Sequence, residues 1–308
     1  VGAGPAGVRL AQEFACRRPD ARIAIFGAEP SEPYNRVRLS SFLAGELGWN
    51  SLTADLALPR GPNLDVHLGC AVARIDRESK CIVDILGRAW PYRKLALALG
   101  STPHVPDIPG IRRPGVYTFR DARDADRLAA RRLHSRRTAV LGGGLLGLET
   151  ARAMRRFRTE VTVIEHAGEV MARQLDPASA GRMRAHIGRL GIRVVLGEGV
   201  RCVLGEPRVK ALLLRGGETL ECDTLVVATG IRPNIELART AGLAVGAGIR
   251  VDDRLQTSDA DIHAIGECAE HRERIYGLAA PGFEQAAVAA HNLAGGRANY
   301  LGSIAATR

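Results

Sequence analysis

Apolar residues recur along this chain of 308 residues in short runs that end at glycine-rich turns. The runs at 94–100 and 224–230 have the length and composition of buried strands. Two further apolar strands, at 21–29 and 159–167, each follow a glycine-rich turn and a helix-like stretch. Buried strands that alternate with helices predict an α/β protein with parallel sheets.

Longer stretches with interrupted apolar patterns lie between these strands. Residues 72–97 and 200–227 have the pattern of antiparallel hairpins. Arginine and aspartate alternate at helical spacing within 119–137, which predicts a solvated helix with internal ion pairs. Prolines and glycines interrupt regular structure at 104–115, and we expect a domain boundary there.

The order of glycine turn, strand and later strand-turn occurs twice. The repeated turn positions are Gly2, Gly4 and Gly7, and then Gly142, Gly144 and Gly147. This duplication predicts two Rossmann-like, three-layer nucleotide-binding domains, with the second inserted in the first. We expect the first domain to consist of residues 1–108 and 229–308, and the second of residues 109–228.

A G-x-G-x-x-G turn between a strand and a helix is suited to the pyrophosphate of a dinucleotide. The first glycine allows a tight turn, the second lets the backbone approach the phosphates, and the third lets helix and strand pack closely. The helix N-terminus then attracts the phosphate charge. The candidate contacts at the two turns are Gly2, Gly4, Pro5, Ala6, Gly7, Gly142, Gly144, Leu145, Leu146 and Gly147.

Each turn is followed by an acidic residue at the distance expected for a ribose contact. Glu29 lies 22 residues after Gly7, and Glu165 lies 18 residues after Gly147. Two dinucleotide sites imply two nucleotides, and a flavin with a diffusing nicotinamide is the usual pair, since hydride can pass between their stacked rings. The Glu165 carboxylate would repel a 2′-phosphate, which favours NADH over NADPH, although a protonated His166 would weaken that repulsion.

Composition restricts the class of protein further. The net charge is +10, and only three of the 43 basic residues are lysine. A GC-rich coding sequence explains the excess of arginine over lysine. The alternative is a positive face that attracts an acidic redox partner or an anion. Aromatic residues are only 4%, too few for the stacking platforms of nucleic-acid binding. No apolar run approaches the ~18 residues of a membrane helix. The six cysteines form no close pair, which argues against a disulfide scaffold or zinc ribbon and favours a cytoplasmic protein.

Three longer stretches carry a family resemblance, namely "EPYNRVRLSSFLAGE" (32–46), "VMARQLD" (170–176) and "GECAEHRERIYGLAAPGFEQA" (266–286). With the double glycine turn, they resemble the FAD- and NAD(P)H-dependent oxidoreductases of the pyridine nucleotide-disulfide reductase superfamily. Within it, the chain is similar to the flavin-binding part of the assimilatory nitrite reductase large subunit, and to rubredoxin and ferredoxin reductases. The resemblance covers nearly the whole chain.

The resemblance implies that the first turn holds FAD and the second NADH. It assigns Glu267 to the ribityl chain, Arg36 to the flavin and the backbone of Val72 to the adenine, and it places Glu149 near the stacked rings as a candidate catalytic residue. A helix beginning within 281–286 would point its N-terminus at the flavin pyrimidine. The implied FAD contacts beyond the turn are Glu29, Arg36, Val72, Ala98, Gly100, Gly266, Glu267 and Phe283, and the implied NAD contacts are Glu165 and Gly230.

The chain departs from the family pattern at several positions. Glu267 stands where most members have aspartate, and Leu99 interrupts an Ala-Thr-Gly crossover. Ser41 occupies a place where rubredoxin-reductase relatives often have lysine, so contacts at flavin N5 are expected to differ. Residues 34–46 contain no cysteine pair, so we expect electrons to leave the flavin without a redox-active disulfide.

One other constellation has the spacing of metal ligands. His263, Cys268 and His271 form H-x4-C-x2-H, but a metal site would need another ligand and a suitable fold. We expect a loop beside the flavin and no metal, with Cys268 as a small buried residue.

These observations predict an enzyme that passes hydride from NADH to FAD and then electrons to an acceptor. The resemblance makes a role in assimilatory nitrite or nitrate reduction the leading hypothesis. Because the chain has no cysteine cluster for iron–sulfur or sirohaem ligation, we expect it to be the electron-input module of such an enzyme. A reductase of rubredoxin or ferredoxin is the alternative. A slow redox sensor or assembly factor is an alternative of another class. We expect the sequence to be part of a longer chain and the C-terminal interface domain of the family to be absent from it.

Overall fold

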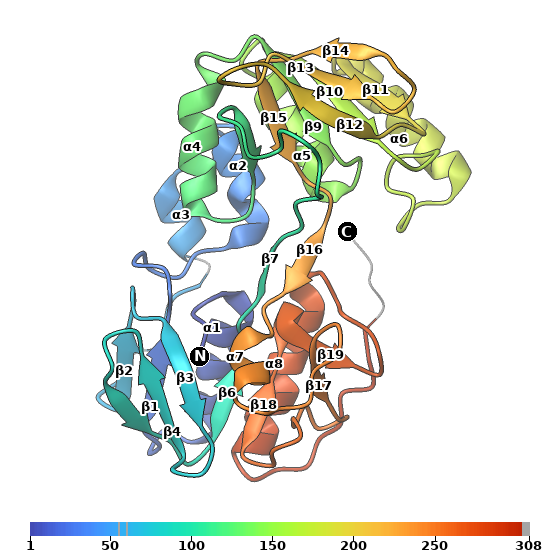
Figure 1. The fold of residues 1–308 in the computed structure, drawn as a ribbon. Coiled ribbons are helices and arrows are strands. Elements are labelled where there is room, and N and C mark those ends of the chain that lie inside the picture. The colour runs from blue at the N-terminus through green and yellow to red at the C-terminus, as the bar shows by residue number, and fades with distance from the viewer. Residues whose placement is uncertain (55, 60, 304–308) are drawn as a thin grey trace. The chain divides into compact units, whose positions relative to one another are not determined.

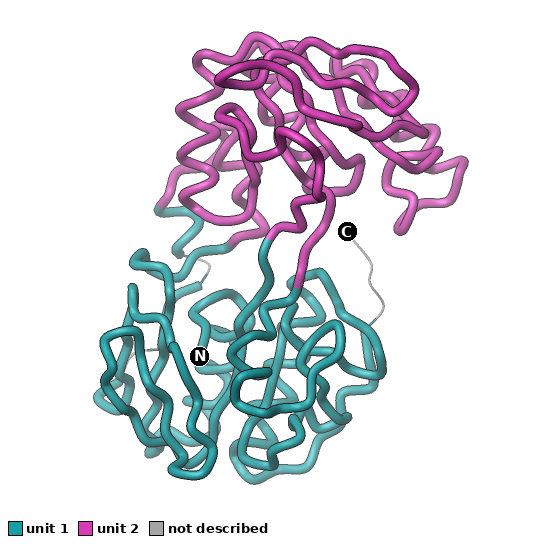
Figure 2. The backbone as a smooth tube through the Cα atoms, in the orientation of Figure 1, with its two compact units in different colours: residues 1–35, 50–102, 233–306 teal, residues 36–49, 103–232, 307–308 magenta. Residues whose placement is uncertain are grey.

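The computed structural model describes residues 1–54, 56–59 and 61–303. The described chain divides into two compact units, which Figure 2 colours separately. Unit 1 contains residues 1–35, 50–102 and 233–303, and unit 2 contains residues 36–49 and 103–232.

Figure 1 labels most elements of both units. The elements of unit 1 are α1 (Pro5–Arg17), β1 (Ile23–Phe26), β2 (Leu64–His67), β3 (Val72–Asp76), β4 (Cys81–Asp84), β5 (Ala89–Pro91), β6 (Leu95–Leu97), α7 (Glu236–Thr240), β17 (Ile249–Val251), β18 (Ile262–Ala264), the 3-10 helix η2 (Gly266–Cys268), β19 (Ala269–His271) and α8 (Ala279–Leu293). The elements of unit 2 are the 3-10 helix η1 (Arg36–Arg38), α2 (Leu39–Leu43), β8 (Val116–Thr118), α4 (Ala122–Arg132), β9 (Arg137–Leu141), α5 (Leu145–Arg155), β10 (Glu160–Glu165), α6 (Pro177–Arg189), β11 (Ile192–Leu196), β12 (Val200–Leu204), β13 (Ala211–Leu214), β14 (Thr219–Glu221) and β15 (Thr224–Val227). Three elements span the unit boundaries, namely α3 (Trp49–Ala54), β7 (Ser101–Pro103) and β16 (Ile231–Pro233).

Unit 2 is built on a five-stranded parallel sheet with the strand order β11-β10-β9-β15-β8. Helix α5 connects β9 to β10, and α6 connects β10 to β11. From β9 the chain runs outward through β10 and β11 and then returns to β15 on the other side of β9, so the sheet has a topological switch point between β9 and β15. Open α/β sheets bind ligands at the carboxyl ends of strands beside such a point. A three-stranded antiparallel sheet, β12-β13-β14, precedes β15.

Unit 1 repeats this arrangement around its first residues. Val1 lies between β6 and β1, because its amino group donates to the Ala96 carbonyl at 2.7 Å and its own carbonyl accepts the Ala98 N–H at 2.8 Å. The Gly2 N–H donates to the Phe26 carbonyl at 2.8 Å. With the parallel pairs β1–β2 and β6–β18, the order is β2-β1-Val1-β6-β18. Val1 therefore takes the place that β9 has in unit 2.

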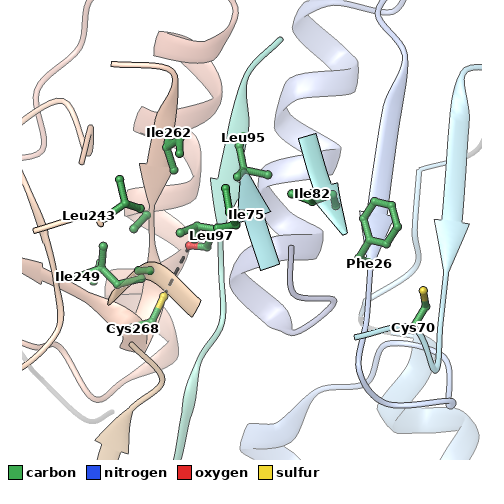
Figure 3. Packing of buried hydrophobic residues seen from close by; sticks show 13 residues of the cluster. Phe26, Cys70, Ile75, Ile82, Leu95, Leu97, Leu243, Ile249, Ile262 and Cys268 are labelled. Carbon is green, nitrogen blue, oxygen red and sulfur yellow. Dashed lines mark hydrogen bonds between the residues drawn. The ribbon is translucent and has the colours of Figure 1, made fainter. Parts of the chain in front are cut away.

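The core of unit 1 joins this sheet to a three-stranded antiparallel sheet, β3-β4-β5. Figure 3 shows Leu97 and Ile262 from the parallel strands packed near Ile75. The Cys268 sulfur lies in the same cluster, 3.6 Å from the Leu97 carbonyl oxygen. Burying each aliphatic side chain contributes about 1.5–3 kcal/mol, so the cluster fixes the strand ends that carry the candidate site.

The structure confirms the α/β class and most of the elements expected from the pattern. The hairpins expected within 72–97 and 200–227 are the two antiparallel sheets. The helix expected within 119–137 is α4, whose N-cap residue Asp121 accepts the Asp124 N–H at 2.9 Å. The helix expected to begin within 281–286 begins earlier, at Ala279.

The unit boundaries differ from the expected domains at three segments. Residues 103–108 and 229–232 belong to unit 2, whereas the expected boundaries placed them in the first domain. Residues 36–49 belong to unit 2, whereas the sequence order placed them in the first domain. Helix α2 packs against α4 and α5, and local sequence carries no signal of such a long-range contact. The assignment of the units to FAD and NAD stays a prediction. Among the described residues, no helix combines the length and apolar character that crossing a bilayer requires.

Candidate functional site

The first glycine turn has no room for side chains at two of its positions. Gly2 has φ +109°, and a Cβ there would lie 2.1 Å from the Ala98 carbonyl oxygen. A Cβ on Gly7 would lie 2.0 Å from the Gly2 carbonyl oxygen. Both clashes are with backbone atoms, so no rotamer change relieves them. The strand, the turn and α1 therefore approach one another at the distance that only glycine permits.

The second glycine turn has the same geometry. Gly142 has φ +118°, and a Cβ there would lie 2.3 Å from the Ala228 carbonyl oxygen. A Cβ on Gly147 would lie 2.0 Å from the Gly142 carbonyl oxygen. Since Ala228 follows β15 directly, this turn lies at the switch point of the unit 2 sheet.

The middle glycines of the two turns cap helices. Gly4 is the N-cap of α1 (φ −78°, ψ −179°), and Gly144 is the N-cap of α5 (φ −78°, ψ 179°). Because glycine has no side chain, neither cap residue accepts an N–H group of the first helical turn through a side chain. The N–H groups of the first helical turn are thus available to a phosphate. A Cβ on Gly144 would meet nothing within 4 Å, so the second glycine turn is open on the side of its middle glycine.

The residues after these caps complete the helix starts. Pro5 occupies the first turn of α1, where its missing N–H costs nothing. Leu145 and Leu146 begin α5 and are 38% and 37% exposed. Two leucines exposed beside an open cradle provide apolar surface against which a nucleotide can pack.

Three segments of unit 1 converge at Ala6 in the first turn of α1. A Cβ on Gly266 would lie 3.2 Å from the Ala6 Cβ, and a Cβ on Gly282 would lie 3.5 Å from it. The Gly266 N–H donates to the side-chain oxygen of the buried Gln285 at 2.7 Å. The N-termini of α1 and α8 and the turn after β18 therefore form one local site.

Glu267 and Phe283 lie on two of these segments. Glu267 belongs to η2, and its carboxylate accepts the Ser101 hydroxyl at 2.8 Å. Ser101 begins β7, so the strand end after β6 positions the carboxylate. Phe283 is half-buried in α8. The structure thus brings Glu267, Phe283 and the first glycine turn together in unit 1.

The carboxylate of Glu165 folds back onto the second glycine turn. Its Oε2 accepts the Gly143 N–H at 2.5 Å, and its Oε1 accepts the Ala167 N–H at 2.8 Å. The exposed His166 ring places Nδ1 2.8 Å from Oε1. Two backbone N–H donors hold this carboxylate in place at the end of β10. It is 8% exposed, so a second anion beside it would be repelled with little screening.

Glu29 has a different partner. The hydroxyl of the buried Tyr34 donates to Glu29 Oε2 at 2.7 Å. The Gly69 N–H donates to the Glu29 carbonyl at 2.9 Å, which fixes the backbone of this residue against the segment after β2. Glu29 is therefore held after β1 as Glu165 is held after β10, but through a tyrosine.

The strand-end turns after β6 and β15 supply the oxygens against which the glycines pack. Ala98 and Ala228 approach Gly2 and Gly142 as described above. Gly100 (φ +64°) and Gly230 (φ +109°) then turn the chain toward β7 and β16. The His104 N–H donates to the Gly230 carbonyl at 2.8 Å, which closes the second of these turns.

Arg36 and Val72 fall in different units. Arg36 begins η1 in unit 2, and Val72 begins β3 in unit 1, where it packs against the core. Their contacts with flavin and adenine stay predictions, as do the nucleotide contacts of every other candidate residue.

Glu149 lies in α5 with its side chain half-buried. Burial raises the pKa of its carboxyl group, although the Ser40 hydroxyl hydrogen bond and the Arg152 charge oppose the rise. Ser40 belongs to α2, so the segment 36–49 shapes the environment of this residue. A raised pKa biases a carboxyl group toward its neutral, proton-holding form.

The cysteines and the H-x4-C-x2-H spacing show no metal or disulfide geometry. All six cysteines are described and free. Cys268 is buried with Sγ 3.3 Å from the Ile265 carbonyl oxygen, and burial raises its pKa to about 11. His271 Nε2 lies 2.9 Å from Asp253 Oδ1, while His263 is 2% exposed. Across the described ranges, no three His, Cys, Asp or Glu side chains gather as a metal site.

Sequence reasoning missed three side chains that hold the candidate residues. Tyr34 and Ser101 bond the two acidic residues Glu29 and Glu267, and neither has a recognisable spacing. Gln285 offered a signal, because a polar residue on the apolar side of a helix needs a buried partner. That partner is the Gly266 N–H.

Comparison with known proteins gives consistent matches. A family model described as pyridine nucleotide-disulphide oxidoreductase matches residues 1–292. Nitrite reductase [NAD(P)H] of Bacillus subtilis is 39% identical over 312 residues, 100% of this chain and 39% of the relative. The assimilatory nitrate reductase electron transfer subunit of Bacillus subtilis is 37% identical, over 96% of this chain and 38% of the relative.

A solved structure agrees with these sequence matches. A ferredoxin reductase from Rhodopseudomonas palustris superposes with a TM-score of 0.91 at 32% identity, covering 97% of this chain and 76% of the other. The chain spans about two fifths of the length of the two curated relatives above. Its fold therefore corresponds to most of a ferredoxin reductase and to a minor part of the nitrite and nitrate enzymes.

Proposed function

This chain belongs to the pyridine nucleotide-disulphide oxidoreductase family, and on that premise we propose that it transfers hydride from NADH to FAD and then electrons to an acceptor. One observation carries the proposal. Two glycine turns with the same backbone clashes and the same helix caps recur 140 residues apart, each with a fixed acidic residue after the next strand. The clashes at the first and third glycines fix the tight turn and the close packing of helix and strand that a dinucleotide-binding turn requires.

The unit 1 residues would hold the flavin nucleotide. The first-turn N–H groups of α1 would bind the pyrophosphate, and Glu29 would accept hydrogen bonds from the adenosine ribose. Glu267, held by Ser101, would bind the ribityl hydroxyls. The N-terminus of α8 would stabilise negative charge at the pyrimidine end of the ring. When bound, FAD supplies the redox chemistry that takes up hydride and releases electrons.

The unit 2 residues would hold the nicotinamide nucleotide. The N-terminus of α5 would bind its pyrophosphate, and Glu165 would accept hydrogen bonds from its ribose. Because both Glu165 oxygens already accept backbone N–H groups, the carboxylate cannot easily turn away from a 2′-phosphate. We therefore propose NADH as the preferred donor, and we assign Glu149 the role of a proton-holding group beside the rings.

For the acceptor, we propose an iron–sulfur or sirohaem centre in nitrite or nitrate assimilation, in the cytoplasm. Identity over the full chain to a nitrite reductase and to a nitrate reductase electron transfer subunit supports this choice. The ferredoxin reductase match favours a second candidate, in which the acceptor is a separate rubredoxin or ferredoxin. All six cysteines are free, and neither proposal routes electrons through a disulfide.

Anaerobic mixing with NADH tests the proposal. We expect the purified protein to be yellow, to bleach rapidly on adding NADH and then to reduce an iron–sulfur acceptor. Bleaching over minutes without acceptor turnover would favour a sensor. A colourless protein that takes up no FAD on reconstitution would contradict the proposal outright.

The nucleotide preference is tested by Glu165→Ala. Removing the carboxylate removes the repulsion of a 2′-phosphate, so we expect the ratio of kcat/KM for NADH over NADPH to fall by about tenfold. Glu160→Ala, at an exposed glutamate at the other end of β10, is the control and should leave the ratio unchanged. If the unmodified protein already prefers NADPH, the role of Glu165 is wrong.

A further inference from the structure

A cavity of about 800 Å³ lies in unit 2 beside the edge strand β8. It is lined by the segment after β7, by β8 itself, by α4, by the loop between β12 and β13, and by the end of β15. None of the candidate nucleotide-binding residues lines it. Its volume lies within the range of about 300–1,000 Å³ that is typical of small-molecule sites. The proposed function leaves it without a role.

Four arginines from separate segments line this cavity, and they are Arg112, Arg127, Arg208 and Arg232. Arg112 precedes β8, Arg127 lies on α4, and Arg208 lies on the β12–β13 loop. In the part of the chain that the structure describes, the side chains of these three arginines form no hydrogen bond and no ion pair within 4 Å. The fold thus holds three cationic groups around one cavity without neutralising them.

Several other arginines of unit 2 are paired with carboxylates. Arg131 lies 2.8 Å from Asp223, Arg156 lies 2.6 Å from Glu46, and Arg193 lies 3.0 Å from Glu218. Carboxylates of this unit therefore pair with arginines elsewhere in its fold. A group of unpaired arginines around one hollow is a local excess of positive charge.

Two carboxyl groups also line the cavity, and they do not cancel this charge. Asp107 is exposed. Asp124 Oδ2 accepts both the Thr118 hydroxyl at 3.0 Å and the Arg120 N–H at 2.9 Å, so one of its two oxygens is engaged at the start of α4. Burial raises the pKa of Asp124, although the charge of Arg127 opposes the rise. Arg112, Arg127 and Arg208 against these two carboxyls leave the site positive.

The rest of the lining is largely apolar. Val105, Ile111, Val116 and Val227 contribute aliphatic surface. A site that combines guanidinium groups with aliphatic walls fits a ligand with both anionic groups and a carbon skeleton. Guanidinium groups bind phosphate and carboxylate through paired N–H donors.

We propose that this cavity is a binding site for a small organic anion that carries phosphate or carboxylate groups, separate from both dinucleotide sites. Val227 lines the cavity, and the next residue, Ala228, packs against Gly142. A residue that lines the cavity is therefore the chain neighbour of a residue that packs against the second glycine turn.

Calorimetric titration tests the proposal with inorganic pyrophosphate and with citrate as probes. The protein is first saturated with FAD and NAD⁺ so that the glycine turns are filled. We expect at least one probe to bind with a Kd below about 5 mM and to weaken as NaCl is raised. Binding of pyrophosphate alone assigns phosphate, binding of citrate alone assigns carboxylate, and binding of both assigns the shared chemistry.

Two double variants locate the binding. Arg127→Ser/Arg208→Ser should weaken the probe by at least about tenfold. Arg184→Ser/Arg201→Ser removes two exposed, unpaired arginines of unit 2 outside the cavity, so it matches the change in net charge and should alter Kd less than about threefold. Equal weakening by both pairs, or no binding of either probe, would overturn the proposal. Because the arginine variants leave the glycine turns intact, the result is independent of the nucleotide assignment.

Discussion

At the scale of single residues, backbone atoms decide which side chains are possible. Gly2 and Gly142 face carbonyl oxygens at distances that exclude any Cβ, and the spacing of glycines in the sequence reports this constraint directly. The fixing of Glu165 is different. Its carboxylate bonds the Gly143 N–H, 22 positions earlier, and this contact exists only after β9 and β10 have paired. Spacing predicted the residue, but not how its carboxylate is held.

His263 offers a pH test at the same scale. It is 2% exposed, and neither ring nitrogen has a hydrogen-bond partner in the described structure. Burial lowers its pKa from 6.5 to about 4, so the unfolded chain binds more protons between these values. The free energy of unfolding should therefore fall as the pH falls from 6.5 to 4, by at most about 3 kcal/mol.

Urea denaturation followed by circular dichroism at pH 6.5, 5.5 and 4.5 measures this effect. His263→Leu removes the titrating group and should flatten the loss of stability over this interval. The exposed His134→Leu is the control and should keep the slope of the unmodified protein. A slope that survives in His263→Leu would contradict the assignment.

At the scale of elements, one carboxylate joins three segments of unit 2. Asp223 stands before β15 and accepts five hydrogen bonds, from Arg131, Ser135, Arg136, Arg137 and Thr224. These donors come from the end of α4, from the start of β9 and from β15 itself. Although burial alone would raise the pKa of Asp223, the hydrogen bonds hold it below its ordinary value. The carboxylate therefore aligns the two strands that flank the switch point.

Asp223→Ala should destabilise the protein by about 2–4 kcal/mol, because it leaves two N–H groups and a guanidinium without their acceptor. Thermal unfolding by differential scanning calorimetry measures the loss as a lower Tm. Asp126→Ala, at an exposed aspartate of α4, is the control and should change stability by less than about 0.5 kcal/mol. Equal effects of the two changes would rule out the joining role.

The elements themselves were largely predictable, and their grouping was not. Strands and hairpins follow from local apolar patterns, so β6, β15 and both antiparallel sheets appear where expected. Residues 36–49 follow the first strand in sequence but pack in unit 2, where Glu46 pairs with Arg156 of the turn after α5. No local pattern encodes a pairing across 110 positions.

At the scale of the whole molecule, the same sheet order occurs twice, once in each unit, beside two glycine turns with different surroundings. The order β2-β1-Val1-β6-β18 in unit 1 matches β11-β10-β9-β15-β8 in unit 2. The donors that hold the two glutamates differ, because Tyr34 holds Glu29 and backbone N–H groups hold Glu165. Within unit 1 the turn adjoins the N-terminus of α8. A change at one glycine turn should therefore weaken the binding of one nucleotide and leave the binding of the other unchanged.

Aspartate in place of the capping glycine tests this independence. Gly144→Asp meets no steric obstacle, since a Cβ there has nothing within 4 Å, and aspartate is a favourable N-cap. The added charge repels a pyrophosphate, so KM for NADH should rise at least about tenfold while the protein stays yellow. Gly4→Asp should instead abolish FAD retention. Gly181→Asp, at an equally open site in α6, should change neither, and loss of FAD from Gly144→Asp would mean that the nucleotides are assigned to the wrong turns.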